Sequence, residues 1–90
     1  MEINKTNSGT IHIGHLIEEQ LRGDDRSVSW LARQIPCTRN HVYKIFRKSS
    51  LDCALLLRIS KIMQFNFFQY YSAEVAGSLT ERMGEEVNLQ

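Results

Sequence analysis

The sequence predicts an all-α protein of four to five helices built around one core. Apolar residues recur at intervals of three and four rather than two, which is the period of a helix and not of a strand. The 90 residues contain a single proline, so few helix-breaking positions interrupt this pattern. An apolar content of 42% supplies enough side chains for a modest core in a chain of this length.

The first helix is expected to begin after a cap at Thr10 and to end near Gly23, which tolerates the left-handed conformation that follows a helix. Glu18 and Arg22 lie four residues apart on its polar side, in the favourable order for an ion pair. Its inward stripe is formed by Ile13, Leu16, Ile17 and Leu21.

Two short helices follow, separated by a turn around Pro36. Ser27 is a favourable cap for the first of them, residues 28–35, and the proline ends that helix because it disfavours helical geometry in the residue before it. Thr38 is the expected cap of the second, residues 39–48. The apolar positions of that second helix are Val42, Ile45 and Phe46.

A fourth helix is expected after a cap at Ser49 or Ser50, with Asp52 near the positive end of its dipole. Its broad apolar face predicts that it crosses the middle of the core, and comprises Leu55, Leu56, Ile59, Ile62 and Met63. The chain then turns near Asn66 into a short aromatic segment, residues 67–71.

These elements predict three regions: an N-terminal arm at residues 1–9, a helical domain at 10–72 and a tail at 73–90. Two interpretations of the tail are open: a frayed or disordered segment, or a helix used against a partner. Gly77 and Gly84 disfavour a helix. One narrow apolar stripe favours it, consisting of Val75, Leu79, Met83 and Val87.

Charge is distributed unevenly along a chain whose net charge is only +1. Residues 26–51 contain six basic side chains and no acidic one, so the rest of the chain sums to −5. Such asymmetry predicts a polyanionic partner for this segment, and nucleic acid is the commonest. The six basic residues are Arg26, Arg33, Arg39, Lys44, Arg47 and Lys48.

The two helices around Pro36 have the apolar spacing of a DNA-binding helix-turn-helix. The positions that form this motif are Leu31, Ala32, Ile35, Cys37, Val42 and Ile45. At these positions the sequence resembles the lambda-repressor-like (Xre-type) family, in particular its small stand-alone bacterial members.

The resemblance covers about residues 11–72 and extends through "KSSLD" and "FFQYY". It implies a four- to five-helix DNA-binding domain and a bacterial transcriptional regulator, most simply a repressor. One position departs from the family: Pro36 stands where members often have glycine. Because proline does not favour the positive φ that glycine permits, we expect this turn to close by another route.

If Val42 and Ile45 point inward, the polar residues of the third helix point outward. In the family this helix enters the major groove, which implies base contacts by residues at its start. Arginine suits guanine and asparagine suits adenine. The implied base-contacting residues are Arg39, Asn40, Tyr43 and Lys44.

A second group is expected to hold the DNA backbone. The hydroxyls and free amides at the start of the second helix favour binding of an anion. The remaining basic side chains favour contacts with phosphate. The implied phosphate-contacting residues are Ser27, Ser29, Thr38, Arg47 and Lys48. Two alternatives stay open: Asn40 supporting Thr38 in helix initiation, and Tyr43 resting its ring on Arg39 or Arg47.

A lone helix-turn-helix covers few base pairs, so the resemblance implies a homodimer on a palindromic site. We expect its dimer surface on the aromatic segment and the tail. An antitoxin-like or other protein-interaction module, binding a protein partner through its acidic tail, is the alternative function.

Other classes are not favoured. The cysteine–histidine spacing at Cys37 and His41, and the pair His12 and His15, do not give a four-ligand zinc set, so no metal or cofactor is expected. Neither a nucleophile–base set nor a phosphate loop appears, so we expect no enzyme. Two cysteines and a polar start indicate a reducing cytoplasm, with no signal peptide or membrane span.

Overall fold

The computed structural model describes residues 11–83, with side chains as far as Leu79. This part of the chain contains five α-helices and no strand, which confirms the predicted all-α class. The helices are α1 (Ile13–Gly23), α2 (Val28–Gln34), α3 (Arg39–Phe46), α4 (Cys53–Met63) and α5 (Gln69–Met83).

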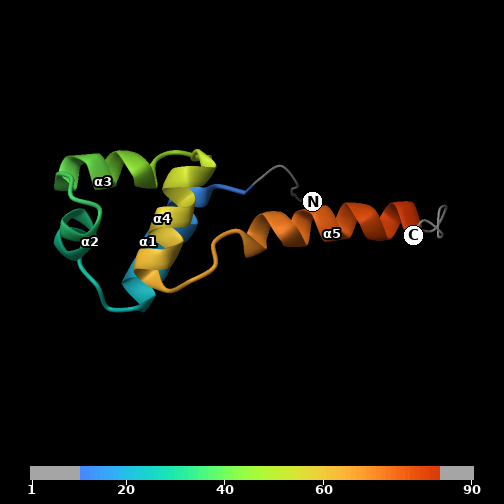
Figure 1. Cartoon of the computed structure of the whole chain (residues 1–90), viewed down its shortest axis with the longest axis horizontal. Helices are drawn as coiled ribbons and strands as arrows, with labels where there is room; N and C mark the ends of the chain where they lie inside the picture. The colour runs from blue at the N-terminus through green and yellow to red at the C-terminus, as the bar shows by residue number, and fades with distance from the viewer. Residues whose placement is uncertain (1–10, 84–90) are drawn as a thin grey trace.

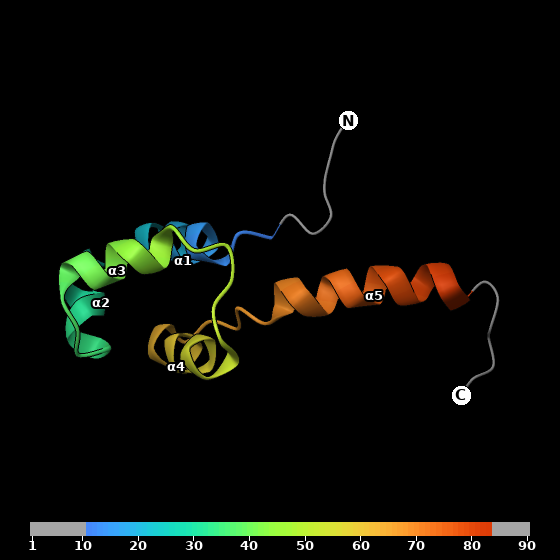
Figure 2. The same cartoon turned by 90° about the horizontal axis from the view of Figure 1, so that it is seen from above.

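The helices divide the molecule into a packed part and a projecting part (Figure 1). Helix α3 packs on both α1 and α2, and α4 adds three side chains to the same core. Helix α5 points away from the other four, in the view of Figure 1 and from above in Figure 2. The core consists of Ile13, Ile17, Leu21, Leu31, Ala32, Ile35, Val42, Ile45, Phe46, Leu56, Ile59, Met63 and Phe67.

The beginning of α1 is attached to the end of α3. The backbone N–H groups of Ile13 and Gly14 donate to the carbonyl oxygens of Ser49 and Lys48, at 3.1 and 3.0 Å. The first N–H groups of a helix have no acceptor within the helix itself. These two bonds give them acceptors, and they hold the end of α3 in position against α1. A Cβ on Gly14 would lie 2.6 Å from the carbonyl carbon of Phe46, so only glycine allows this approach.

The cap of α1 is a histidine. His12 Nδ1 accepts a hydrogen bond from the backbone N–H of His15 at 3.2 Å, and the two imidazole rings stack with centroids 3.8 Å apart. The expected cap, Thr10, lies outside the described residues. The predicted ion pair between Glu18 and Arg22 is confirmed, at 3.1 Å.

Three helices end in the same motif (a Schellman motif), in which a residue after the helix has a positive φ and the N–H of the next residue donates to a carbonyl five residues earlier. The donors Arg26, Cys37 and Phe65 reach the carbonyls of Leu21, Ala32 and Ser60 at 3.1, 2.9 and 3.1 Å. The left-handed residues are Asp25, Pro36 and Gln64, with φ of 60°, 31° and 55°. For α1 this corrects the expectation that Gly23 takes the left-handed position, because Gly23 is still helical.

The expectation that Pro36 closes the turn by another route was wrong. Pro36 takes a positive φ of 31°, whereas the proline ring favours a φ near −65°. The hydrogen bond from Cys37 and the burial of Ile35 hold it there. Since proline has no N–H, the turn also lacks the second bond of the motif, which Asp25 and Gln64 each make.

Two predicted boundaries need correction. Helix α3 ends at Phe46 rather than Lys48, because its carbonyls at Lys44 and Ile45 turn to the N–H groups of Arg47 and Lys48. Helix α4 is capped by Asp52 and not by Ser49 or Ser50: the Asp52 carboxylate accepts from Leu55 N–H at 2.9 Å.

The aromatic segment continues into α5 without a break, so the expected boundary between residues 72 and 73 falls inside one helix. Residues 84–90 of the predicted tail, with Gly84 and Val87, and the predicted arm at 1–9 lie outside the described residues. Among residues 11–83, no helix combines the length and the apolar character that crossing a bilayer requires.

Candidate nucleic-acid interface

Helix α3 has one buried face and one exposed face. Val42, Ile45 and Phe46 are 0%, 1% and 4% exposed and pack toward the core. Five residues of the helix and of its C-cap fall on an arc of about 140°, given 3.6 residues per turn, and His41 lies beside that arc. All five residues on the arc are exposed: Arg39, Asn40, Tyr43, Lys44 and Arg47.

The start of α3 is fixed by Thr38. Its hydroxyl oxygen accepts a hydrogen bond from the backbone N–H of His41 at 3.1 Å, which orients the first turn. Asn40 takes no part in this cap, so the alternative role considered for it is not the one observed. Its amide is therefore available on the outer face of the helix.

Tyr43 does not rest on either arginine. Its ring meets the ring of Phe46 edge-on, with centroids 6.1 Å apart and planes at 83°. Phe46 is buried, so this contact steadies the tyrosine while leaving it 46% exposed. The arginine that does stack on an aromatic ring is Arg26, whose guanidinium carbon lies 4.2 Å from the centroid of Trp30.

The basic side chains on this face have no acidic partner among the described residues. Glu18 and Arg22 do form an ion pair, but both residues belong to α1 and not to this face. Arg39, Lys44 and Arg47 thus present uncompensated positive charge to solvent, which favours a polyanion.

The predicted phosphate contacts are spread over two helices. Ser27 caps α2, its hydroxyl accepting from the backbone N–H of Trp30 at 3.0 Å, and Ser29 lies half-buried one residue into the helix. Thr38 and Arg47 stand at the two ends of α3. Lys48 differs from these residues because its side chain points in another direction.

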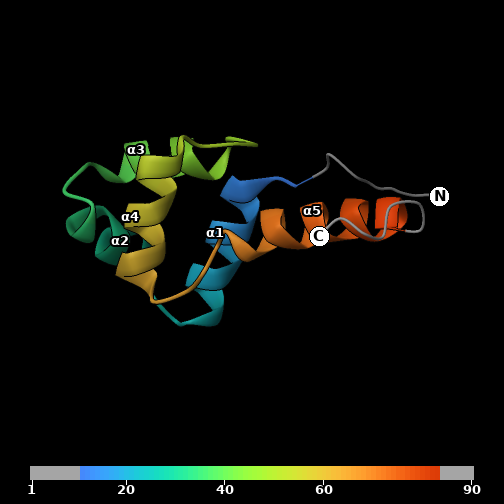
Figure 3. The same cartoon turned by 45° about the vertical axis from the view of Figure 1, so that its right-hand side comes forward.

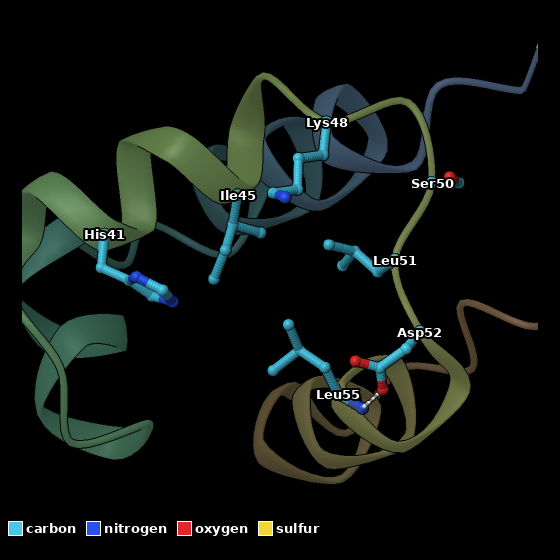
Figure 4. A pocket seen from close by; sticks show the side chains of 7 residues that line it. All are labelled: His41, Ile45, Lys48, Ser50, Leu51, Asp52 and Leu55. Carbon is cyan, nitrogen blue, oxygen red and sulfur yellow. Dashed lines mark hydrogen bonds between the residues drawn. The ribbon is translucent and has the colours of Figure 1, made fainter.

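Lys48 lines a pocket of about 440 Å³ between α3 and α4 (Figure 4). His41, one side of which faces the same pocket, lies seven residues earlier on that edge of α3. Ile45, Leu51 and Leu55 form the apolar wall, and the Asp52 carboxylate there already accepts a hydrogen bond from Leu55. From the sequence, His41 was considered only as a metal ligand, and its pairing with Lys48 was missed, because Lys48 lies beyond the end of α3 and the helical period does not fix its direction.

The two cysteines lie apart from each other, at different places in the described part of the chain. Cys37 is half-buried in the turn between α2 and α3, and Cys53 is exposed at the start of α4. Within residues 11–83 no three histidine, cysteine or acidic side chains gather in a way that could hold a metal ion.

Comparisons with protein-family models, with curated proteins and with solved structures find no match to this chain. Function is therefore inferred from the geometry of α3 and its surroundings.

Proposed function

We propose that the chain is a sequence-specific DNA-binding regulator of lambda-repressor-like type, in which α2 and α3 act as a helix-turn-helix. The observation that carries this proposal is the outer face of α3, which is exposed, basic and without a carboxylate partner in the described part of the chain. The inner face of the same helix is held by the core.

The dimensions of α3 suit a major groove. An α-helix with its side chains is about 10–12 Å in diameter, close to the width of the major groove. Arg39 and Asn40 lie in its first turn, which is the part of a recognition helix that meets base edges. Arg39 would donate two hydrogen bonds to guanine, and Asn40 would pair with adenine.

The remaining polar groups would set the register on the duplex. Arg47 at the end of α3, together with the hydroxyls of Ser27 and Thr38, would contact phosphates without distinguishing sequence. Lys48 and His41 would contact a phosphate only at the opening of the pocket between α3 and α4 that they line. A protein that occupies its operator excludes others from it, so repression is the simplest regulatory outcome.

The first test is selection of bound sequences from a random DNA pool at stated salt, because affinity and specificity both depend on ionic strength. Enrichment of one sequence is expected. Recovery of unenriched DNA at low salt alone would contradict sequence-specific binding.

The second test assigns the residues. Arg39→Ala is expected to lose about 1–3 kcal/mol on the selected site and to relax preference at one base pair. Arg47→Ala should weaken binding to all sequences evenly and reduce by about 1 the slope of the logarithm of the binding constant against the logarithm of the salt concentration. Lys48→Ala should have the same effect only if the Lys48 side chain leaves its pocket when the wild-type protein binds DNA. Arg58→Ala, which removes the same charge from the exposed side of α4, is the matched control and should change neither quantity.

A further inference from the structure

The pocket between α3 and α4 is lined by three parts of the chain. Helix α4 runs steeply across the direction of α3, and residues 47–52 connect the two helices (Figure 3). The lining of the pocket comes from α3, from this connection and from α4, and its volume is about 440 Å³. Pockets that hold small ligands have volumes of about 300–1,000 Å³. The size of this pocket is therefore that of a small-molecule site.

The wall of the pocket is apolar where the three parts meet. Ile45, which is 1% exposed, points into it from α3. The half-buried Leu51 and Leu55 point toward Ile45 from the connection and from α4 (Figure 4). A ligand whose apolar group covers these side chains removes apolar surface from water, which favours binding.

Polar side chains of opposite character surround this apolar wall. Figure 4 shows Lys48 and His41 along the edge of α3, and Asp52 across the pocket from His41. Lys48 and Asp52 form no ion pair with each other, although both line the pocket. One oxygen of Asp52 accepts from Leu55 N–H at 2.9 Å, and its second oxygen can still accept from a ligand. The pocket thus offers donors on one side and a carboxylate on the other.

We propose that this pocket binds a free α-amino acid with a large apolar side chain. The carboxylate of the ligand accepts hydrogen bonds from Lys48 and His41, and its ammonium group donates to Asp52. Its side chain covers Leu51 and Leu55.

The two charges of the pocket select the class of ligand. A carboxylic acid that lacks the ammonium group would bring its negative charge near Asp52 with nothing to offset the repulsion. An amine that lacks the carboxylate would bring its positive charge near Lys48 in the same way. An α-amino acid carries both charges on one carbon, next to its side chain, and so matches both sides of the pocket and the apolar wall together.

Binding is expected to be weak and selective. Lys48, His41 and Asp52 are exposed, so water and salt screen their interactions with a ligand. For a ligand the size of phenylalanine we expect a dissociation constant of about 0.1–2 mM. L-Alanine has the same charges but little apolar surface, and should therefore bind at least about tenfold more weakly than L-phenylalanine or L-leucine.

The test is a titration of the full chain followed through its backbone amide signals by NMR. DNA is left out, so the result does not depend on the proposed function. L-Phenylalanine should cause saturable shifts that are largest at His41 and at residues 48–55. N-Acetyl-L-phenylalanine and L-phenylalaninamide each lack one of the two charges, and should bind about three- to tenfold more weakly.

Asp52→Asn is the most informative variant, because asparagine also caps helices and preserves the start of α4. It should weaken binding of L-phenylalanine about three- to tenfold and strengthen binding of N-acetyl-L-phenylalanine, whose carboxylate no longer meets a like charge. A variant that had only lost its fold would weaken both. Lys48→Gln should likewise weaken L-phenylalanine and strengthen L-phenylalaninamide. Lys61→Gln removes the same charge from an exposed lysine of α4 that does not line the pocket, and should change neither.

Four results would overturn the proposal. The first is the absence of saturable shifts with L-phenylalanine and L-leucine at several times the expected dissociation constant. The second is equal binding of L-alanine, which would show that the apolar wall takes no part. The third is N-acetyl-L-phenylalanine binding to the wild-type chain as tightly as L-phenylalanine. The fourth is a set of shifts centred on α1 or α5 and not on the pocket.

Discussion

Helices α1–α4 each contain two to four buried residues, whereas α5, the longest of the five, has none among residues 69–79, the part whose side chains are described. In the first four, short helices of 7 to 11 residues are held by side chains that meet across the core. Among residues 69–79 of α5, only Tyr70 and Tyr71, in its first turn, reach the packed part of the molecule. How firmly a helix is held therefore depends on how much of it is buried and not on its length.

The difference also separates two kinds of surface. The outer face of α3 is polar and basic on a helix fixed from behind, which suits recognition of a rigid polyanion. The outer face of α5 is apolar on a helix with little support of its own, which suits association that supplies the missing packing. Substitutions of the same kind should therefore act differently in the two parts.

The largest expected contrast in stability is between the truncation of a buried aromatic side chain, Phe67, and the truncation of an exposed aliphatic one, Leu79. Phe67 is fully buried and its backbone N–H donates to the Ser60 hydroxyl at 3.3 Å. Phe67→Ala should lower the free energy of unfolding by about 3–5 kcal/mol, measured by urea titration. Leu79→Ala, measured in protein dilute enough to be monomeric, should change it by less than about 0.5 kcal/mol. Equal losses would show that α5 is part of the core.

The next contrast concerns glycine in α1. Gly14→Ala places a Cβ against the carbonyl groups of Ile45 and Phe46, so α1 and α3 have to separate. We expect a loss of about 1–3 kcal/mol, as for other overpacked sites, and weaker DNA binding because the end of α3 moves. Gly23→Ala, whose Cβ would meet nothing within 4 Å, is the control and should not destabilise the fold. A harmless Gly14→Ala would mean that the two helices can part freely.

Pro36→Gly tests strain inside the packed part. Relief of an unfavourable φ is worth about 1–3 kcal/mol, and the greater freedom of glycine in the unfolded chain returns about 0.5–1 kcal/mol of it. A net gain of about 1 kcal/mol in the free energy of unfolding is expected, helped by a new N–H that can donate to Arg33. Gln64→Gly, at the same position of the motif after α4, should gain less because Gln64 already makes that bond. A loss of stability in Pro36→Gly would show that the proline is not strained.

Most of the packed part could be predicted from the sequence, since periodic apolar residues such as Ile17, Leu31 and Ile59 state directly which face turns inward. What could not be predicted depended on contacts between elements. Gly14 carries no periodic signal, because its importance comes from carbonyl groups on α3. The prediction for Pro36 used the intrinsic preference of proline, which the neighbouring burial and hydrogen bond override.

The candidate site divides in the same way. The outward position of Arg39, Asn40 and Lys44 follows from helical period alone. The direction of Lys48 does not, because it lies beyond the end of α3, where the chain has left the helical path. The pocket it shares with His41 arises where α4 comes near, a relation that no local pattern specifies.

The smallest effect is expected from Gly77→Ala, the counterpart in α5 of the change at Gly14. A Cβ there would meet nothing within 4 Å, and alanine is favoured over glycine by about 1 kcal/mol in a helix interior. In the monomer this should raise helicity measured by circular dichroism and slow amide exchange in α5, while the urea midpoint of the packed part stays unchanged. If the midpoint rises by the full amount, α5 unfolds together with α1–α4 and the division drawn between them fails. If only local exchange slows, the same substitution has opposite consequences in two helices of one chain, and the reason is the presence of a neighbour at Gly14 and its absence at Gly77.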